Sequence, residues 1–263
     1  MKMKIASLFV SLGLFGLMGT ANAYENGVVE SAGVSGNYIS IPQGANPKIL
    51  PGLGARAGMT AKDSDTFYRA YLELLGAWTK DAQNKSAFMG GQARLGAGVF
   101  DLEKVYYAVF SDLDFDSASN KAKNQGALVW VTGGEVGRQF VRGNSAVFVG
   151  ANSGVGVIRA WNKNKEAASQ GLPANHDFRR IVPEVGISID GRIGENNNRG
   201  TVHVNSSTAF LLGEGRRSNV GADVNISKHI QVGGGYRQVN LQGPADGKIS
   251  VWSPFFRVTL GAF

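Results

Sequence analysis

The sequence of 263 residues contains no cysteine, which excludes disulfides, thiolate metal sites and cysteine nucleophiles. After Tyr24 it also lacks any apolar run of the length, about 20 residues, that a membrane-spanning helix needs. Apolar residues spaced near the helical period of 3.6 form no convincing window either. These absences disfavour a helical membrane protein and leave strands as the main elements.

The start of the chain has the three parts of a secretory signal peptide. Lys2 and Lys4 form a basic start, an apolar run covers residues 5–18, and small residues at 21–23 form a cleavage site. The apolar run is too short to span a bilayer as a helix. We therefore expect residues 1–23 to be removed during export.

Alternation of apolar and polar residues, which is typical of half-buried strands, dominates from Thr66 onward. Between Arg180 and Arg192, for example, most odd positions are apolar and most even positions are polar or small. Many of the predicted strands exceed the 9–11 or so residues of a tilted bilayer crossing. The ten predicted strands cover residues 66–79, 86–100, 104–113, 124–140, 144–162, 178–193, 200–213, 217–226, 229–242 and 248–263.

The region before these ten strands leaves the strand number open. Two more strands near 34–42 and 51–60 fit the alternation, although prolines interrupt it. We therefore divide the mature chain into an N-terminal segment, 24–65, and a barrel, 66–263. The N-terminal segment is predicted to hold the first two strands or to form a periplasmic or lumenal arm. The predicted fold class is all-β: an antiparallel up-and-down transmembrane β-barrel of about twelve strands, with ten as the alternative.

The placement of charge distinguishes a membrane barrel from a soluble β-sandwich. A lysine or arginine facing lipid at the bilayer midplane costs about 2–4 kcal/mol, and less near the edges. Arg138 and Arg159 fall on the apolar face but lie near strand ends, where long side chains can reach the interface. Nine other charged residues of the ten predicted strands lie on the less apolar face of their strand. The residues predicted to line the lumen are Arg69, Glu73, Arg94, Glu135, Arg180, Glu184, Asp223, Arg237 and Arg257.

Aromatic residues and connection lengths predict the orientation of the barrel. Connections on the predicted periplasmic side are mostly short, and the two longest, Asp112–Asn124 and Asn162–Asp177, fall on the outer side, as in transmembrane barrels. Tryptophan is enriched at the two membrane interfaces. The residues predicted to form an outer aromatic girdle are Trp78, Trp130, Trp161 and Trp252.

The signal peptide, the alternating strands, the girdle, the absence of cysteine and the terminal Phe263 together resemble bacterial outer-membrane β-barrel proteins of the porin-like class. The resemblance covers the mature chain and is architectural. Phe263 falls out of register with the apolar face of the last strand, so the likeness to the signal read by the barrel-assembly machinery is partial.

This resemblance implies a place in the outer membrane of a Gram-negative bacterium, among its lipids and lipopolysaccharide. It also implies contact with the barrel-assembly machinery during insertion. The leading hypothesis is a porin-like channel for passive diffusion of small solutes. The alternative is a non-conducting structural or surface-interaction barrel that acts through its outer loops. Oligomeric state is not predicted.

One set of polar residues suggests a lipid acyl hydrolase as a third hypothesis. His203, Asn205 and Ser207 share one face of a predicted strand. Outer-membrane phospholipases and lipid A deacylases use histidine and serine at the barrel wall, because the histidine activates the serine hydroxyl. Those enzymes place the serine two residues after the histidine, where this chain has Asn205. We therefore predict no catalytic residue and no enzyme.

An alternating acidic motif suggests cation binding. Asp112, Asp114 and Asp116 are spaced like the first three ligands of a calcium loop, but Ser117 replaces the glycine and Lys123 the final glutamate. We therefore expect a solvated outer loop and predict no metal ligand and no cofactor. The basic excess, +7 for the whole sequence, is too dispersed for a nucleic-acid surface.

Overall fold

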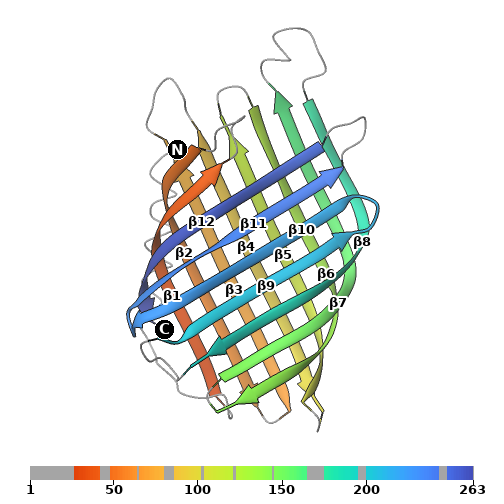
Figure 1. Ribbon diagram of the computed structural model, residues 1–263. Coiled ribbons are helices and arrows are strands. Elements are labelled where there is room, and N and C mark those ends of the chain that lie inside the picture. Colours follow the sequence, from red (N-terminus) through yellow and green to blue (C-terminus); the bar gives the residue numbers. More distant parts are fainter. Residues whose placement is uncertain are drawn as a thin grey trace.

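Twelve antiparallel strands form a closed barrel in the computed structural model, in which each strand pairs with its neighbours in the sequence and β12 pairs with β1 (Figure 1). The structure describes residues 27–41, 48–63, 65–79, 86–101, 104–120, 123–143, 145–164, 175–194, 200–242 and 248–262. The first six strands are β1 (Gly27–Ile41), β2 (Lys48–Asp63), β3 (Thr66–Trp78), β4 (Ala87–Phe100), β5 (Val105–Ser119) and β6 (Lys123–Arg142). The others are β7 (Ser145–Asn164), β8 (Asn175–Ile193), β9 (Val202–Leu211), β10 (Gly215–Ser227), β11 (Ile230–Gln242) and β12 (Lys248–Ala262).

The N-terminal segment supplies two full strands, so the barrel has twelve strands rather than ten. β1 pairs with β2 along its whole length and with β12 from Ala32 to Ile39. Pro51 lies in register with Tyr38 of β1, but pairing with β3 begins only at Gly52. Pro51 therefore has a strand neighbour on one side only, a position at which a residue without an N–H is tolerated. The other prolines of this region, at 42 and 47, fall outside the described residues, as does Phe263.

The connections differ in one place from those predicted. The long outer loop expected over Asp112–Asn124 is absent from the structure: β5 continues to Ser119, and β6 begins at Lys123. The connection between β7 and β8, residues 165–174, remains the longest in the barrel. The strand ends that it joins, Asn164 and Asn175, lie at the outer end. The opposite end, at which β12 finishes and most of the short connections lie, is called the periplasmic end below.

The outer surface of the barrel is apolar along the strands. Leu95, Val109 and Ile187 are each more than 60% exposed although they stand in the middle of strands. Among the described residues, no helix is long and apolar enough to cross a membrane. A closed sheet leaves no unpaired edge, and an apolar outer face suits contact with lipid tails. The chain is thus an all-β closed antiparallel barrel of the outer-membrane type.

Three of the four tryptophans predicted to form the girdle can be placed. Trp78 ends β3 at the outer rim, and Trp130 stands on the outer surface of β6, each about half exposed. Trp161 of β7 stacks on Phe115 of β5, with 6.1 Å between the ring centroids. The side chain of Trp252 lies outside the described residues.

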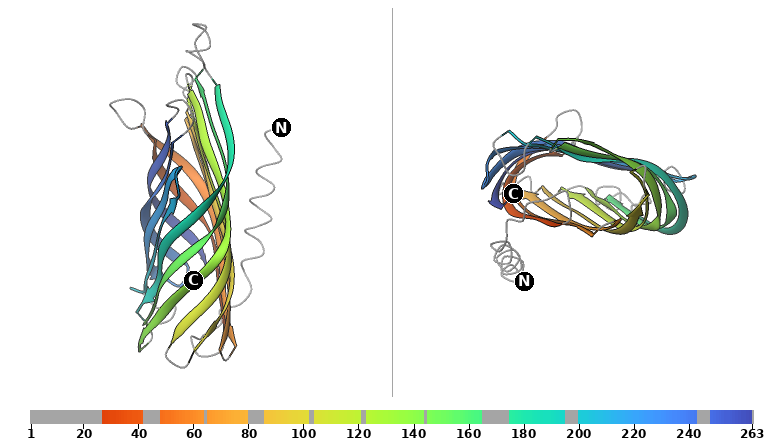
Figure 2. Two further views of the ribbon diagram at one scale, coloured as in Figure 1. Left: turned by 90° about the vertical axis from the view of Figure 1, so that its right-hand side faces the viewer. Right: turned by 90° about the horizontal axis from the view of Figure 1, so that it is seen from below.

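The barrel is flattened, so that its two walls approach each other. Figure 2 shows the oval outline from below. Cα atoms of β12 come within 8 Å of Cα atoms of β5, β6 and β7, which belong to the opposite wall. In Figure 1 the strands β9 to β12 cross obliquely in front of β3 to β5. Side chains that point inward from the two walls can therefore touch.

Glycines on the inner face make room for large side chains beneath them. A Cβ atom added at Gly150 of β7 would lie 2.8 Å from the Oε1 atom of Glu135 and closer still to the hydroxyl of Tyr106. A Cβ atom at Gly134, on the outer face of β6, would meet nothing nearer than the carbonyl oxygen of Ala108 at 3.8 Å. The first glycine is therefore required by packing, and the second is not.

We expect Gly150→Ala to lower the free energy of unfolding by about 1–3 kcal/mol, because Tyr106 or Glu135 must shift to admit the methyl group. Gly134→Ala is the matched control and should change stability little. Urea unfolding of the two variants in detergent micelles measures the difference. Equal stability of the two variants would contradict this account of the inner wall.

Candidate functional site: the barrel interior

Many buried apolar side chains of the interior lie toward the outer end of the barrel. They form one buried cluster, and each cited member is at most 8% exposed. All of the following lie nearer the outer end of their strands than the periplasmic end: Ile39, Leu50, Leu75, Phe88, Val129, Ile158, Phe178, Leu211 and Leu241. The cluster lies toward the outer end of the barrel, and charged side chains such as Arg217 of β10 stand beside it on the inner face.

Below this cluster, Arg217 of β10 joins the two walls. Its guanidinium donates two hydrogen bonds of 2.8 Å to Glu184 on β8, which is 1% exposed. It also donates to Asp112 at 3.1 Å and to Asp114, both on β5 in the opposite wall. One arginine is thus neutralised by three buried carboxylates, in the geometry of charge-assisted hydrogen bonds.

Two further arginines bridge the walls nearby. Arg237 of β11 forms ion pairs with Glu73 of β3 at 3.5 Å and with Asp116 of β5 at 3.3 Å. Arg257 of β12 pairs with the same glutamate and donates from Nε to Asp223 of β10 at 2.8 Å. Both arginine side chains are 3% exposed. These pairs and those of Arg217 are called the cross-lumen network below.

Arg94 of β4 connects this network to the periplasmic end. It pairs with Glu135 of β6 and, at 3.5 Å, with Asp112. Glu135 also accepts a hydrogen bond from the hydroxyl of Tyr106. On the other side of the barrel, Arg56 of β2 donates to Asp223 at 2.9 Å.

The remaining two predicted lumen arginines are held differently. Arg69 of β3 stacks on aromatic rings, with its Cζ atom 3.9 Å from the ring centroid of Phe148. Arg180 of β8 lies near the outer rim, where it pairs with Glu214 in the turn before β10 and remains 44% exposed.

All nine residues predicted to line the lumen stand on the inner face. Seven of them belong to the cross-lumen network or to its extension through Arg94, and they do not border an open passage. The seven are Glu73, Arg94, Glu135, Glu184, Asp223, Arg237 and Arg257. The prediction missed Arg56 and Arg217. It placed Arg217 at the boundary of a predicted strand, and it considered only the ten strands that begin at Thr66, which exclude Arg56. The alternation on either side of both residues could have identified them.

The expectation of a solvated loop for the three aspartates is wrong. Asp112, Asp114 and Asp116 point inward from β5 and are 5%, 8% and 2% exposed. Arginines from β10 and β11 stabilise the carboxylates there, so the strand continues through them. Among the described residues, no group of three histidine, cysteine or acidic side chains is placed to hold a metal ion.

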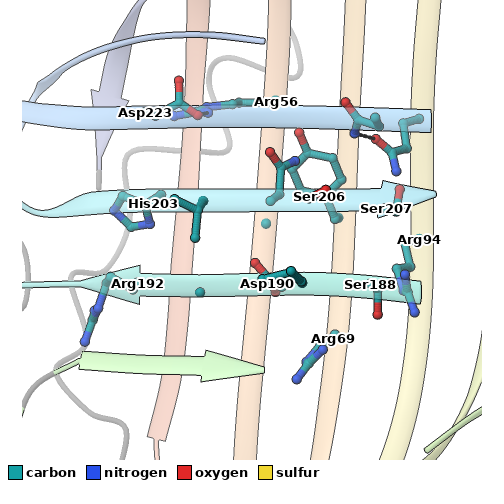
Figure 3. A pocket seen from close by; sticks show the side chains of 18 of the residues that line it. Arg56, Arg69, Arg94, Ser188, Asp190, Arg192, His203, Ser206, Ser207 and Asp223 are labelled. Atoms are coloured by element: carbon teal, nitrogen blue, oxygen red, sulfur yellow. Dashed lines mark hydrogen bonds and ion pairs between the residues drawn. The ribbon is translucent and has the colours of Figure 1, made fainter. Parts of the chain in front are cut away.

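The structure does not bring the candidate hydrolase residues together. His203 and Ser207 point inward from β9, but four residues at about 3.3 Å each separate them by about 13 Å. The register neighbours of His203 are Arg192 and Asp223, and neither offers a hydroxyl group. His203, Asn205 and Ser207 instead line a chamber in the periplasmic half of the barrel (Figure 3).

No protein-family model and no curated protein matches this sequence. Among solved structures, the translocator domain of the autotransporter NalP from Neisseria meningitidis is similar at 11% identity and a TM-score of 0.49, over 97% of this chain and 94% of that one. The toluene transporter TodX of P. putida is similar at 10% identity and a TM-score of 0.36, over 91% of each chain. The β domain of the Bordetella autotransporter Brka is similar at 14% identity and a TM-score of 0.39, over 88% of this chain and 99% of that one. Similarity at these sequence identities and TM-scores supports no inference about function.

Replacing an arginine of the cross-lumen network should lower the free energy of unfolding far more than replacing an exposed arginine. We expect Arg257→Met to lower the free energy of unfolding by about 3–5 kcal/mol, because Glu73 and Asp223 would lose a buried partner. Arg159→Met is the control, since Arg159 pairs with Asp177 at an exposed position and such pairs contribute about 0–1 kcal/mol. Urea unfolding in micelles compares the two. Similar losses in both variants would show that the network contributes little.

Proposed function

We propose that the protein is a non-conducting barrel of a Gram-negative outer membrane that acts through the surface at its outer rim. The observation that carries this proposal is the cross-lumen network, together with the apolar cluster that lies toward the outer end of the interior. A barrel of twelve strands lies between filled eight-stranded barrels and the water-filled barrels of 16–18 strands. Here side chains from both walls occupy the space through which a solute would pass.

The burial of the network supports a closed interior. Charged side chains that line a water-filled pore remain hydrated, whereas the side chains of Glu184, Arg237 and Arg257 are at most 3% exposed. Removing an ion from water costs several kcal/mol unless partners compensate for the lost hydration. The ion pairs among these side chains supply much of that compensation, although Nε and Nη1 of Arg237 form no hydrogen bond within the described residues.

The outer rim offers a surface for interaction. β6, β7 and β8 have 20, 20 and 19 residues, although a tilted crossing needs only about 9–11. Pairing between β8 and β9 begins at Glu184, and Leu212 also donates to the carbonyl of Pro183, so the part of β8 before Pro183 pairs only with β7 (Figure 1). This outer extension of β6–β8 carries the exposed side chains of Arg179 and Ile181.

A channel for passive diffusion is the second candidate function. It is favoured by the presence of charges of both signs throughout the interior, which would give a hydrophilic lining if the walls moved apart. Conduction would require the ion pairs to separate and the apolar cluster to open. The closed arrangement therefore supports the first candidate better.

Measurement of ion conductance through the protein in a planar bilayer tests whether the lumen is closed. We expect the refolded mature protein, with its folded state verified by heat-dependent gel mobility, to give no discrete current steps. The physical reason is that, along the described strands, the ion pairs and the apolar cluster occupy the space between the two walls. Regular steps of stable amplitude would contradict closure and favour the channel, and their ion selectivity would show which charge dominates the passage.

Replacement of residues 165–174 by a short glycine–serine turn tests the role of the outer rim. We expect cells that produce this variant to lose surface adhesion while the barrel keeps its heat-dependent mobility, because the strands that form the barrel are unchanged. The same replacement at residues 243–247 is the control and should keep adhesion. Unchanged adhesion in the first variant would count against the proposed surface function.

A further inference from the structure

A polar chamber of about 250 Å³ lies inside the barrel, between β2–β4 on one wall and β8–β11 on the other (Figure 3). Arg192, His203 and Gln231 line it, and each stands next to the terminal residue at the periplasmic end of its strand. The apolar cluster occupies the opposite half of the interior. The chamber therefore belongs to the periplasmic side of the closed barrel.

The lining of the chamber includes many groups that can form hydrogen bonds with hydroxyl-bearing ligands. Its amides and hydroxyls include those of Gln92, Asn205, Asn219, Gln231, Ser188 and Ser207. Two carboxylates line it, Asp190 and Asp223, and the second is engaged by Arg56 at 2.9 Å and Arg257 at 2.8 Å. Ligand sites typically hold a few convergent polar groups of this kind.

Arg69 is the lining residue whose contacts differ most from those of the network. Rings rather than carboxylates hold its guanidinium: Cζ lies 3.9 Å from the centroid of Phe148, 4.9 Å from that of Phe67 and 5.6 Å from that of Tyr106. Within the described part of the chain it forms no ion pair with a carboxylate, and its buried Nη2 atom has no hydrogen-bond partner. Stacking fixes the plane of the guanidinium and leaves N–H groups available for an anion.

The opposite wall presents a second buried polar atom. The Nε2 atom of His203 has no hydrogen-bond partner among the described residues. A buried polar atom without a partner costs about 1–3 kcal/mol, so a ligand that bonds to it from inside the chamber gains affinity. Arg69 and His203 come from β3 and β9, on opposite walls, and both line the chamber.

We propose that this chamber binds a small hydroxylated anion, a carboxylate or a phosphate that carries several hydroxyl groups. Arg69 holds the anionic group, and the amides and hydroxyls of β4, β8, β9 and β10 hold the hydroxyl groups. The volume lies just below the range of about 300–1,000 Å³ that accommodates drug-sized ligands, which favours a molecule of sugar size. This site is separate from the outer-rim surface and does not depend on the function proposed for it.

Titration calorimetry of the refolded mature protein in detergent micelles tests the proposal with gluconate, glucose 6-phosphate and the neutral polyol sorbitol. We expect at least one of the two anions to bind with a dissociation constant below about 1 mM and sorbitol to bind at least tenfold more weakly. Binding of gluconate alone would assign the site to carboxylates, and binding of glucose 6-phosphate alone would assign it to phosphates. Absence of binding by both anions to folded protein would overturn the proposal.

Variants of the lining locate the binding. Arg69→Met should weaken anion binding at least tenfold, whereas Arg180→Met, which removes an inner-face arginine at the outer rim, should leave it unchanged. Ser207→Leu fills the chamber without changing its charge and should also abolish binding, so the test remains valid if Arg69→Met fails to fold. Asp190→Asn should strengthen binding several-fold by removing a negative charge. Wild-type affinity in both Arg69→Met and Ser207→Leu would overturn the assignment.

Discussion

An arginine inside this barrel must find a carboxylate or an aromatic ring, because an isolated ion in a medium of low dielectric constant costs several kcal/mol. Arg217 meets three carboxylates, and Arg237 and Arg257 share Glu73. Since the partners stand on opposite walls, their bond lengths fix the distance between the walls. The flattened cross-section, the short inner side chains beside the network and the closure of the lumen all follow from this requirement.

The flattening of the barrel accounts both for the apolar cluster toward the outer end and for the chamber toward the periplasmic end. Where the walls carry leucine, isoleucine and phenylalanine, they meet and exclude water, as in an ordinary protein core. Where they carry glycine, serine and asparagine, the smaller side chains leave a chamber, and arginines of both walls enter it. The interior is therefore asymmetric along its axis, with the apolar cluster toward the outer end and the chamber toward the periplasmic end.

The faces of the strands were predictable from the sequence, whereas the partners of the charged residues were not. Period-two alternation identifies which side of a strand points inward, and it placed Glu73, Glu184 and Arg237 on the inner side. It gave no indication that Asp112 and Asp114 are buried, because the arginine that stabilises them lies more than 100 residues later in the chain. In the sequence alone, aspartates at three alternate positions are therefore interpreted as a solvated loop. The chamber was unpredictable for the same reason, since strands distant in sequence form its two walls.

The sequence separation of the network has a consequence for the order of assembly. Arg257 stands on the last strand and pairs with Glu73 of β3, 184 residues earlier. This pair cannot form until the last strand has joined the barrel, although Glu73 and Asp223 can already pair with Arg237 and Arg56. Contacts so distant in the chain form slowly, so the cross-lumen network gains its full set of pairs only when β12 takes its place.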